Sequence, residues 1–584
     1  MSELKPFFRR FLRYRGPLLA GFICIPLAQL ADVGITILIG NALDEASRSE
    51  DADYMAQVVL LLVIAALGHS VFRFFQRWWI VVVSRRVEVD LKQDLFDKLT
   101  SLDFAYHDRS RSGDVVSRVT SDVENLRMFL GPGLMYTAGA TVIVPISLIL
   151  LFQINSTLTA AMVIPMIGMG LTMKLLTPRL HRHSIAVQES LADISHRAQE
   201  NFGGIRVVKG YSRENQQAAR FSATSELNRT NQVLLGKARG LTHAAIHGAF
   251  DLTFVVILLI GGLAAIDPKG LPIGDLFKFI DLTLKVFWPL IALGWIAGMY
   301  PRAVASARRV DELLGTTSPI ADPELPVDLD EVQGSLSMEG VTFSYDGASR
   351  PALVDVDVAV PAGATLGVVG PTGSGKSTLL SLLGRLYDVD SGQVRLDEIA
   401  VKDLRLSDLR GALGYVPQDS FLFSEPYEEN IRFGADHEVS DAEIDHLIAR
   451  VAMAEEVADF PEGKETLVGE RGVTLSGGQR QRTCIARALA RDPKVLILDD
   501  CLSAVDTETE KELLASLRSA GQTRTVVVSA HRLSTVMEAD EILVLDENGQ
   551  VSDRGQHAEL IEREGWYRAT WAQQQRRIEL EVEP

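Results

Sequence analysis

The sequence contains little cysteine, with only Cys24, Cys484 and Cys501, and their spacing follows no pattern of pairing. This scarcity argues against a disulfide framework and favours a reducing compartment around the C-terminal half of the chain. The N-terminus is basic, but no small-residue cleavage site follows a short apolar run, so we expect no cleaved signal peptide.

Basic side chains are scarce in the second half. Residues 321–584 hold 25 Lys and Arg against 49 Asp and Glu, which gives 25 − 49 = −24, whereas residues 1–320 hold 33 against 27. Proteins that bind nucleic acid neutralise its phosphates with Lys and Arg, so this balance argues against nucleic acid as a partner. At 584 residues the chain is also too long for one core, and we expect more than one domain.

Long apolar runs fill the first half. Six of them approach the roughly 20 residues that a helix needs to cross a bilayer. They lie at about residues 17–40, 56–83, 128–152, 158–176, 250–266 and 271–299. Two charged segments with a helical pattern, residues 84–127 and 178–247, interrupt the series. We therefore predict an all-α, six-helix transmembrane domain over residues 1–315.

Lys and Arg indicate how this domain is oriented in the lipid bilayer. They flank the apolar runs on one side, at Arg9, Arg10, Arg13, Arg15, Arg85, Arg86, Lys92, Arg179, Arg182, Arg302, Arg308 and Arg309. The short segments on the other side are poor in Lys and Arg, and residues 41–55 are acidic. By the positive-inside rule, we predict a multi-pass inner (plasma) membrane protein whose termini and long charged segments are cytoplasmic.

Some polar and charged residues fall inside or near the apolar runs. They are Asp32, His69, Arg73, Asp251, Lys278, Asp281 and Lys285. Charge inside a membrane is costly and tends to face a cavity or a pathway. Lys278, Asp281 and Lys285 share one helix face because they are spaced three and four residues apart. They could line a substrate cavity, form an internal ion pair or precede a span that begins later, and the sequence leaves these possibilities open.

A glycine-rich segment in the second half reads G-x-x-x-x-G-K-S-T and stands between an apolar strand-like run and a helical pattern. Its residues are Gly370, Pro371, Thr372, Gly373, Ser374, Gly375, Lys376, Ser377 and Thr378. This context is typical of a phosphate-binding loop, whose backbone N–H groups and helix N-terminus face the phosphates. Lys376 can reach the β- and γ-phosphates, and the Ser377 hydroxyl can ligate Mg²⁺. The segment therefore predicts a site for ATP and Mg²⁺.

The residues around this loop mix strand and helix patterns. Residues 316–334 are rich in Pro, Asp and Thr and are expected to be a linker. Apolar runs at residues 495–499 and 525–529 each follow a helical pattern, as buried parallel strands do. Asp499 ends the first of these runs, where its carboxylate can hold Mg²⁺ through water. We predict a cytoplasmic α/β P-loop nucleotide-binding domain over residues 335–584.

Two adjacent glycines stand at the start of another helical pattern, in the segment Ser476, Gly477, Gly478 and Gln479. A helix N-terminus of this kind is a ready anion site. The segment resembles the signature of the ATP-binding cassette (ABC) superfamily. When the six apolar runs are included, the resemblance covers nearly the whole chain. The chain then resembles an exporter-type half-transporter of the multidrug or lipid kind.

The resemblance also implies roles for further residues. Tyr345 matches the aromatic that stacks on adenine, Gln418 the glutamine that contacts Mg²⁺, and His531 the histidine that senses the γ-phosphate. Residues 503–506 match a loop that crosses between subunits, and residues 469–472 resemble a segment typical of exporters. In the family, two such domains enclose two nucleotides head to tail. The resemblance therefore implies a second ABC half-transporter as partner.

One position departs from the family pattern. The family normally has Glu directly after the Mg²⁺ aspartate, where it polarises the attacking water, and this chain has Asp500. Asp is one methylene shorter, and misplacement by about an ångström can cost on the order of 10²-fold in rate. With Asp500, His531 and Gln418 as catalytic residues, we predict a slow ATP site in one member of a heterodimer, which we favour over a homodimer.

Several alternatives stay open. A homodimer is possible because a positioned Asp can still orient water. An exporter-fold importer of a small metal-chelating molecule and a channel gated by ATP share the same motifs. The six apolar runs count against a soluble ATPase. The transported substrate is expected to be a small amphipathic or hydrophobic molecule, and the sequence does not identify it.

Overall fold

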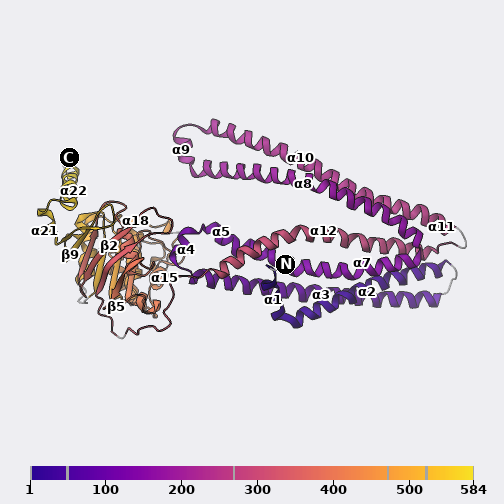
Figure 1. The fold of residues 1–584 in the computed structure, drawn as a ribbon, viewed down its shortest axis with the longest axis horizontal. Coiled ribbons are helices and arrows are strands. Elements are labelled where there is room, and N and C mark those ends of the chain that lie inside the picture. The colour runs from indigo at the N-terminus through magenta and orange to yellow at the C-terminus, as the bar shows by residue number, and fades with distance from the viewer. Residues whose placement is uncertain are drawn as a thin grey trace. The chain divides into compact units, whose positions relative to one another are not determined.

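The computed structural model describes residues 3–47, 52–266, 270–329, 331–469, 472–519 and 524–582. The chain divides into two compact units: Met1–Asp97 with Gly113–Gly315, and Lys98–Ser112 with Thr316–Pro584. Figure 1 shows long helices in the first unit and a mixture of strands and helices in the second. A short segment from between the second and third apolar runs thus belongs to the second unit.

The first unit is entirely helical in the described residues. Its helices are α1 (Lys5–Phe11), α2 (Arg15–Ala46), α3 (Ala52–Ser101), α5 (Ser112–Ser117), α6 (Val123–Met128), α7 (Leu134–Ile154), α8 (Ser156–Gly203), α9 (Ile205–Gly210), α10 (Glu214–Val256), α11 (Gly262–Ile266) and α12 (Ile273–Gly315). Short 3-10 or π-helical turns join some of them, at Leu12–Tyr14, Arg118–Asp122, Phe129–Gly133 and Ile257–Gly261.

Six continuous helical segments of the described chain are long and apolar enough to cross a membrane. They are Lys5–Ala46, Asp53–Ser101, Ser112–Ile154, Ser156–Gly203, Glu214–Ile266 and Ile273–Gly315. The prediction of a six-helix transmembrane domain is confirmed. The helices run well past the apolar runs, because the backbone hydrogen bonds of a helix continue through charged residues that no longer contact lipid.

Two long helices of this unit, α8 and α10, form a hairpin. Figure 1 shows α8 and α10 side by side, with the short helix α9 joining them at one end. Asn155 caps the start of α8, where its side-chain oxygen accepts a hydrogen bond from the backbone N–H of Leu158 at 2.9 Å. Farther along, the side chain of Asn228 on α10 donates a hydrogen bond to the Ser190 hydroxyl on α8 at 2.9 Å. Polar contacts therefore hold the helices together along their charged parts.

Apolar side chains of the first unit point both inward and outward. Ile143, Met162 and Phe279 come from α7, α8 and α12 and are almost fully buried in one cluster. On α3, in contrast, Leu60 and Leu67 are about as exposed as side chains on a protein surface, at 60% and 62%. Large exposed apolar surfaces need a non-aqueous neighbour, and a bilayer supplies one.

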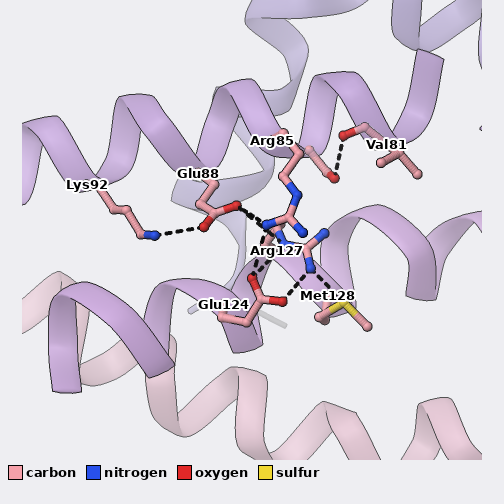
Figure 2. A network of polar contacts seen from close by, with 8 residues as sticks. Val81, Arg85, Glu88, Lys92, Glu124, Arg127 and Met128 are labelled. Atoms are coloured by element: carbon pink, nitrogen blue, oxygen red, sulfur yellow. Dashed lines mark hydrogen bonds and ion pairs between the residues drawn. The ribbon is translucent and has the colours of Figure 1, made fainter. Parts of the chain in front are cut away.

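A charged cluster ties the C-terminal half of α3 to α6 (Figure 2). Glu88 is 9% exposed and accepts hydrogen bonds from Lys92 and Arg85, both at 2.8 Å. Arg127 of α6 lies 3.5 Å from the same carboxylate and also donates to Glu124 at 2.7 Å. A buried carboxylate is stable only when it is paired in this way, so the cluster fixes how the two helices pack.

The second unit has α/β architecture. Its strands are β1 (Leu336–Phe343), β2 (Leu353–Val360), β3 (Thr365–Val369), β4 (Ser391–Leu396), β5 (Ile399–Ala400), β6 (Leu413–Val416), β7 (Val495–Asp499), β8 (Thr525–Ser529), β9 (Glu541–Leu545) and β10 (Val551–Gly555). Its helices are α4 (Phe104–Arg109), α13 (Lys376–Leu383), α14 (Leu406–Ala412), α15 (Tyr427–Arg432), α16 (Asp441–Arg450), α17 (Ala454–Ala458), α18 (Gly477–Leu489), α19 (Thr507–Ser519), α20 (Leu533–Val536), α21 (His557–Glu562) and α22 (Trp566–Val582). The predicted α/β class is confirmed.

The strands form two sheets. The larger sheet has the order β10-β9-β3-β8-β7-β6 and is parallel except at β10, and the smaller, antiparallel sheet has the order β2-β1-β4-β5. In β7, Leu496 and Leu498 pack into one buried cluster, whereas Val495 and Ile497 pack into another on the opposite face. A strand buried on both faces has an unbroken apolar sequence, which is why β7 and β8 could be predicted.

Candidate functional site

The phosphate loop occupies the predicted place between β3 and α13. β3 ends at Val369, and α13 begins at Lys376 with Gly375 as its N-cap. Gly375 has a φ of +92°, and a Cβ atom there would lie 2.6 Å from the carbonyl oxygen of Ala352. Only glycine can adopt this left-handed conformation so close to another segment of backbone. The loop therefore folds tightly against the start of β2.

A cavity of about 540 Å³ opens at this loop. Its lining contains these residues singled out from the sequence: Tyr345, Thr372, Gly373, Gly375, Lys376, Ser377, Thr378, Gln418, Asp499, Asp500 and His531. They come from the ends of β1, β3, β6, β7 and β8 and from the start of α13. Strand ends at one edge of a parallel sheet are a usual place for a ligand site.

The side chains of Lys376 and Ser374 are buried within this loop. The ammonium group of Lys376 is buried and donates to the carbonyl oxygens of Gly370 and Pro371, both at 3.0 Å. Burial lowers the pKa of this ammonium, although the nearby charges of Asp500 and Asp499 act in the opposite direction. The hydroxyl of Ser374 is buried and has no hydrogen-bond partner among the residues that the structure describes. Ser374 itself does not line the cavity.

Asp499 and Ser377 place two oxygen ligands together. The Ser377 hydroxyl donates a hydrogen bond to the Asp499 carboxylate at 3.0 Å. Asp499 is 4% exposed and also accepts a hydrogen bond from the Ser529 hydroxyl at 2.6 Å, which fixes the orientation of its carboxylate. Hydroxyl and carboxylate oxygens are ligands that Mg²⁺ accepts, so the pair fits this ion.

Asp500 is held by its own neighbours. Its backbone has a φ of +43°, and its N–H donates to the backbone oxygen and the hydroxyl of Ser529, at 3.2 and 3.1 Å. Burial raises the pKa of the Asp500 carboxyl above its ordinary value, and the charge and N–H of His531 partly offset that shift. A short polar side chain such as Asp tolerates this left-handed backbone better than a longer one.

Tyr345 lies beside the loop with its side chain 37% exposed. Its hydroxyl is 3.0 Å from the hydroxyl of Thr378, and its ring meets the ring of Tyr387 edge to face, with centroids 5.3 Å apart. Gln418 and His531 line the same cavity and are exposed at the surface. Stacking of Tyr345 on adenine stays a prediction.

The signature residues Ser476, Gly477, Gly478 and Gln479 do not line this cavity. Ser476 caps α18, because its hydroxyl accepts from the backbone N–H of Gln479 at 3.2 Å and the Gln479 side chain accepts from its N–H at 2.8 Å. A Cβ atom on Gly478 would lie 2.9 Å from the carbonyl oxygen of Ala504, so glycine lets the segment 503–506 pack close to α18. In the exporter-like segment 469–472, Glu470 and Arg471 lie outside the described residues.

Sequence reasoning missed three residues that support this site. Ser529 bonds both acids at the end of β7. Arg532 donates to the backbone oxygens of Ser503 and Val505, at 3.3 and 3.2 Å. Gln574 of α22 donates to the backbone oxygen of His531 and accepts from the N–H of Leu533, both at 3.0 Å. Gln574 stands in a run of three glutamines, which carries no signal for such a contact.

Some of the charged residues inside the spans take part in ion pairs. Lys285 lies 2.7 Å from Asp32 and 3.4 Å from Asp281, and Lys278 lies 2.8 Å from Asp275. Asp32 and Lys285 also line a second cavity, within the helices of the first unit. Lys285 therefore forms an ion pair and also lines a cavity, so both of these possibilities apply to it.

The fold and the two cavities define a class: a multi-pass membrane protein with an ATP-binding domain on the same chain. Comparisons with known proteins agree. The family model for the ABC transporter transmembrane region matches residues 18–290, and the ABC transporter model matches residues 353–503. The chain belongs to the ABC transporter family. It is a transporter ATPase that couples the use of ATP to transport across a membrane.

Relatives resemble the chain over its whole length. The multidrug resistance-like ATP-binding protein MdlA of Escherichia coli (strain K12) is 34% identical over 594 residues, which cover 100% of this chain and 98% of that protein. The ATP-dependent lipid A-core flippase of Pseudoalteromonas translucida is 30% identical and covers 90% of each chain. A bacterial Atm1-family ABC exporter with ATP bound has a similar structure, with a TM-score of 0.77 at 28% identity, over 96% of this chain and 98% of that one.

Proposed function

We propose that this chain is one of two half-transporters of a dimeric exporter, and that its own ATP site hydrolyses slowly. In this proposal residues 1–315 form the transmembrane domain, residues 316–334 the linker and residues 335–584 the nucleotide-binding domain. The membrane is the inner (plasma) membrane, with the termini and the nucleotide-binding domain in the cytoplasm. The substrate is a small amphipathic or hydrophobic molecule, as the printed names of the multidrug and lipid relatives suggest for those proteins.

The residues around the 540 Å³ cavity bind ATP with Mg²⁺ in this proposal. Lys376 turns from the carbonyl groups of its own loop to the β- and γ-phosphates, and Tyr345 stacks on adenine. Ser377, Asp499 and Gln418 hold Mg²⁺, which when bound offsets the negative charge of the phosphates. His531 contacts the γ-phosphate. The buried side chain of Lys376 supports this assignment, because it lines the cavity and its ammonium group is a donor for phosphate oxygens.

The position of the signature is the observation that supports a dimer. Ser476 and its glycines lie on α18, outside the cavity that holds Lys376. The N-terminus of a helix can bind an anion. Because this one does not line the chain's own ATP cavity, we infer that it binds the phosphates of a nucleotide held by another subunit. The site on one subunit is then completed by the signature of the other.

Asp500 supports the slow site and a heterodimer. Its carboxylate is one methylene shorter than the Glu expected from the family, and its backbone N–H is bonded to Ser529, which fixes the backbone that carries it. The shorter side chain on this fixed backbone draws the carboxylate back from a water that must be aligned with the γ-phosphate, and misplacement by about an ångström can cost on the order of 10²-fold in rate. A partner with Glu at the equivalent position would supply the fast site, completed by this chain's intact signature.

Hydrolysis by the purified chain tests this proposal. In lipid nanodiscs the natural chain should hydrolyse ATP slowly, and Asp500→Glu should raise the rate strongly, by up to about 10²-fold, because the carboxylate regains its reach. Lys376→Ala is the control that should lose nucleotide binding. Brisk hydrolysis by the natural chain that Asp500→Ala abolishes would contradict the slow site and favour a homodimer that works with Asp.

A further inference from the structure

The second cavity lies among the spanning helices and measures about 480 Å³. Helices α2, α3, α7 and α12 all contribute to its lining. Part of the wall is apolar, with Met135, Ile143 and Trp288, and part is charged, with Arg73, Arg77 and Lys285. Such a wall suits a ligand that has both an apolar and a charged part.

The two arginines of this cavity stand on one face of α3. Arg73 and Arg77 are four residues apart, and His69 lies a further four residues before them, so the three side chains form a stripe along the helix. His69 is fixed by a hydrogen bond between its Nδ1 and the backbone oxygen of Ala28 at 3.0 Å, and Arg73 lies 3.5 Å from its Nε2. Arginine within a spanning helix is costly unless it faces a polar cavity or an anion.

The charge of this cavity is not balanced by the described residues. Asp32 is the carboxylate in its lining, and Asp32 is already paired with Lys285 at 2.7 Å. Within the described part of the chain, neither Arg73 nor Arg77 forms an ion pair with a carboxylate. Two guanidinium groups are therefore left to face the cavity without an opposing charge.

We propose that this cavity binds the anionic head group of an amphipathic molecule. Arg73 and Arg77 bind the anion, because the planar guanidinium group matches carboxylate and phosphate oxygens with two parallel hydrogen bonds. The apolar wall around Ile143 and Trp288 takes the tail. Asp32 and Asp281 both pair with Lys285 and neutralise it, so the arginines carry the selectivity. This inference rests on the proposed function, since it names the substrate class of the exporter.

Direct binding to the full chain tests this site. The probes are dodecyl phosphate, dodecyltrimethylammonium, which has the same tail with a cationic head, and butyl phosphate, which has the anion without the long tail. The chain is embedded in phosphatidylcholine nanodiscs without nucleotide, and empty nanodiscs correct for partition into lipid. Dodecyl phosphate should bind saturably and better than either other probe.

Charge-removing variants locate the binding to the two arginines. Arg73→Gln with Arg77→Gln should weaken dodecyl phosphate binding by about tenfold or more, since two charge-assisted contacts are lost. Arg73→Lys with Arg77→Lys keeps the charge and should retain part of the binding. Lys174→Gln is the matched control, because Lys174 is a cation of the spanning segment of α8 that does not line the cavity.

Three results would overturn the inference. Equal or better binding of dodecyltrimethylammonium shows that the cavity does not select anions. Equal binding of butyl phosphate shows a site for free anions rather than amphipathic ones. Unchanged dodecyl phosphate binding in the double Gln variant shows that the arginines are not the site. If that variant does not fold, binding by the natural chain must still weaken as salt rises, and a flat response overturns the inference. Because nucleotide is absent, these results are independent of the rate at Asp500.

Discussion

The hydroxyl of Tyr387 donates a hydrogen bond to the carboxylate of Asp108, which lies on the short helix α4. Phe104 of α4 also meets the Tyr387 ring edge to face, with centroids 6.2 Å apart. On its other side, Tyr387 contacts the ring of Tyr345, whose hydroxyl is 3.0 Å from that of Thr378 in the phosphate loop. A continuous row of contacts thus joins α4 to the ATP cavity within one compact unit.

Tyr387→Phe removes the hydrogen bond from this row and keeps the ring. A single hydrogen bond contributes about 1 kcal/mol net, so hydrogen exchange of the α4 amides should rise by about fivefold. Exchange measured by mass spectrometry over residues 104–109 checks this. Arg109→Gln is the control, because the Arg109–Asp346 pair is 61% and 70% exposed and such pairs contribute little. Equal exchange in the natural chain and Tyr387→Phe would show that the contact does not hold α4.

The raised pKa of Asp500 predicts a pH dependence. Burial raises the pKa of this carboxyl, so it takes up a proton at a higher pH than an ordinary Asp does. Orienting water needs the carboxylate, so ATP hydrolysis should fall as the pH drops through that raised pKa. Rate profiles across about pH 4 to 8 should show this acid limb, and the residual rate of Asp500→Asn should lack it. The same limb in Asp500→Asn would assign it to another group.

Gln574 is predicted to position His531 from outside the cavity. Its amide bonds the backbone of His531 and Leu533, so Gln574→Ala should loosen the histidine and lower the rate of ATP hydrolysis several-fold. ATP affinity should stay the same, because Gln574 does not line the cavity. The neighbouring, exposed Gln573 offers the control Gln573→Ala. A loss of affinity together with rate, or equal losses in both variants, would contradict a positioning role.

Two strands buried on both faces could be predicted from the sequence, whereas β9, which is buried on both faces as well, was missed. β7 and β8 were expected at residues 495–499 and 525–529, and the structure places them there, because a parallel strand without a solvent face is apolar throughout. Helix ends in the first unit were harder. Hydropathy marks the part of α8 that contacts lipid, up to about residue 176, but the helix continues to Gly203 through charged residues. β4 and β5 were missed because short antiparallel strands carry little periodicity.

Some residues of the site could also be identified from the sequence, and others could not. Lys376, Ser377 and Asp499 could be found because the phosphate loop and the strand that ends in Asp are local in sequence. Ser529 and Gln574 could not, because their roles depend on contacts with residues 30 and 43 positions away. Arg77 was passed over although it lies one turn after Arg73, because an arginine near a span end is also a usual membrane flank.

Complementation between two copies tests the central claim most directly, namely that a second subunit completes the ATP site. In an Asp500→Glu background, Lys376→Ala removes the phosphate-loop lysine and Ser476→Arg blocks the signature. Each variant alone should lack hydrolysis, since every site then misses one part. When the two variants are co-expressed and purified together, mixed dimers contain one intact pairing of loop and signature, and ATP hydrolysis should return. Full hydrolysis by the Ser476→Arg chain alone, or none in a mixture shown to contain mixed dimers, would contradict the account.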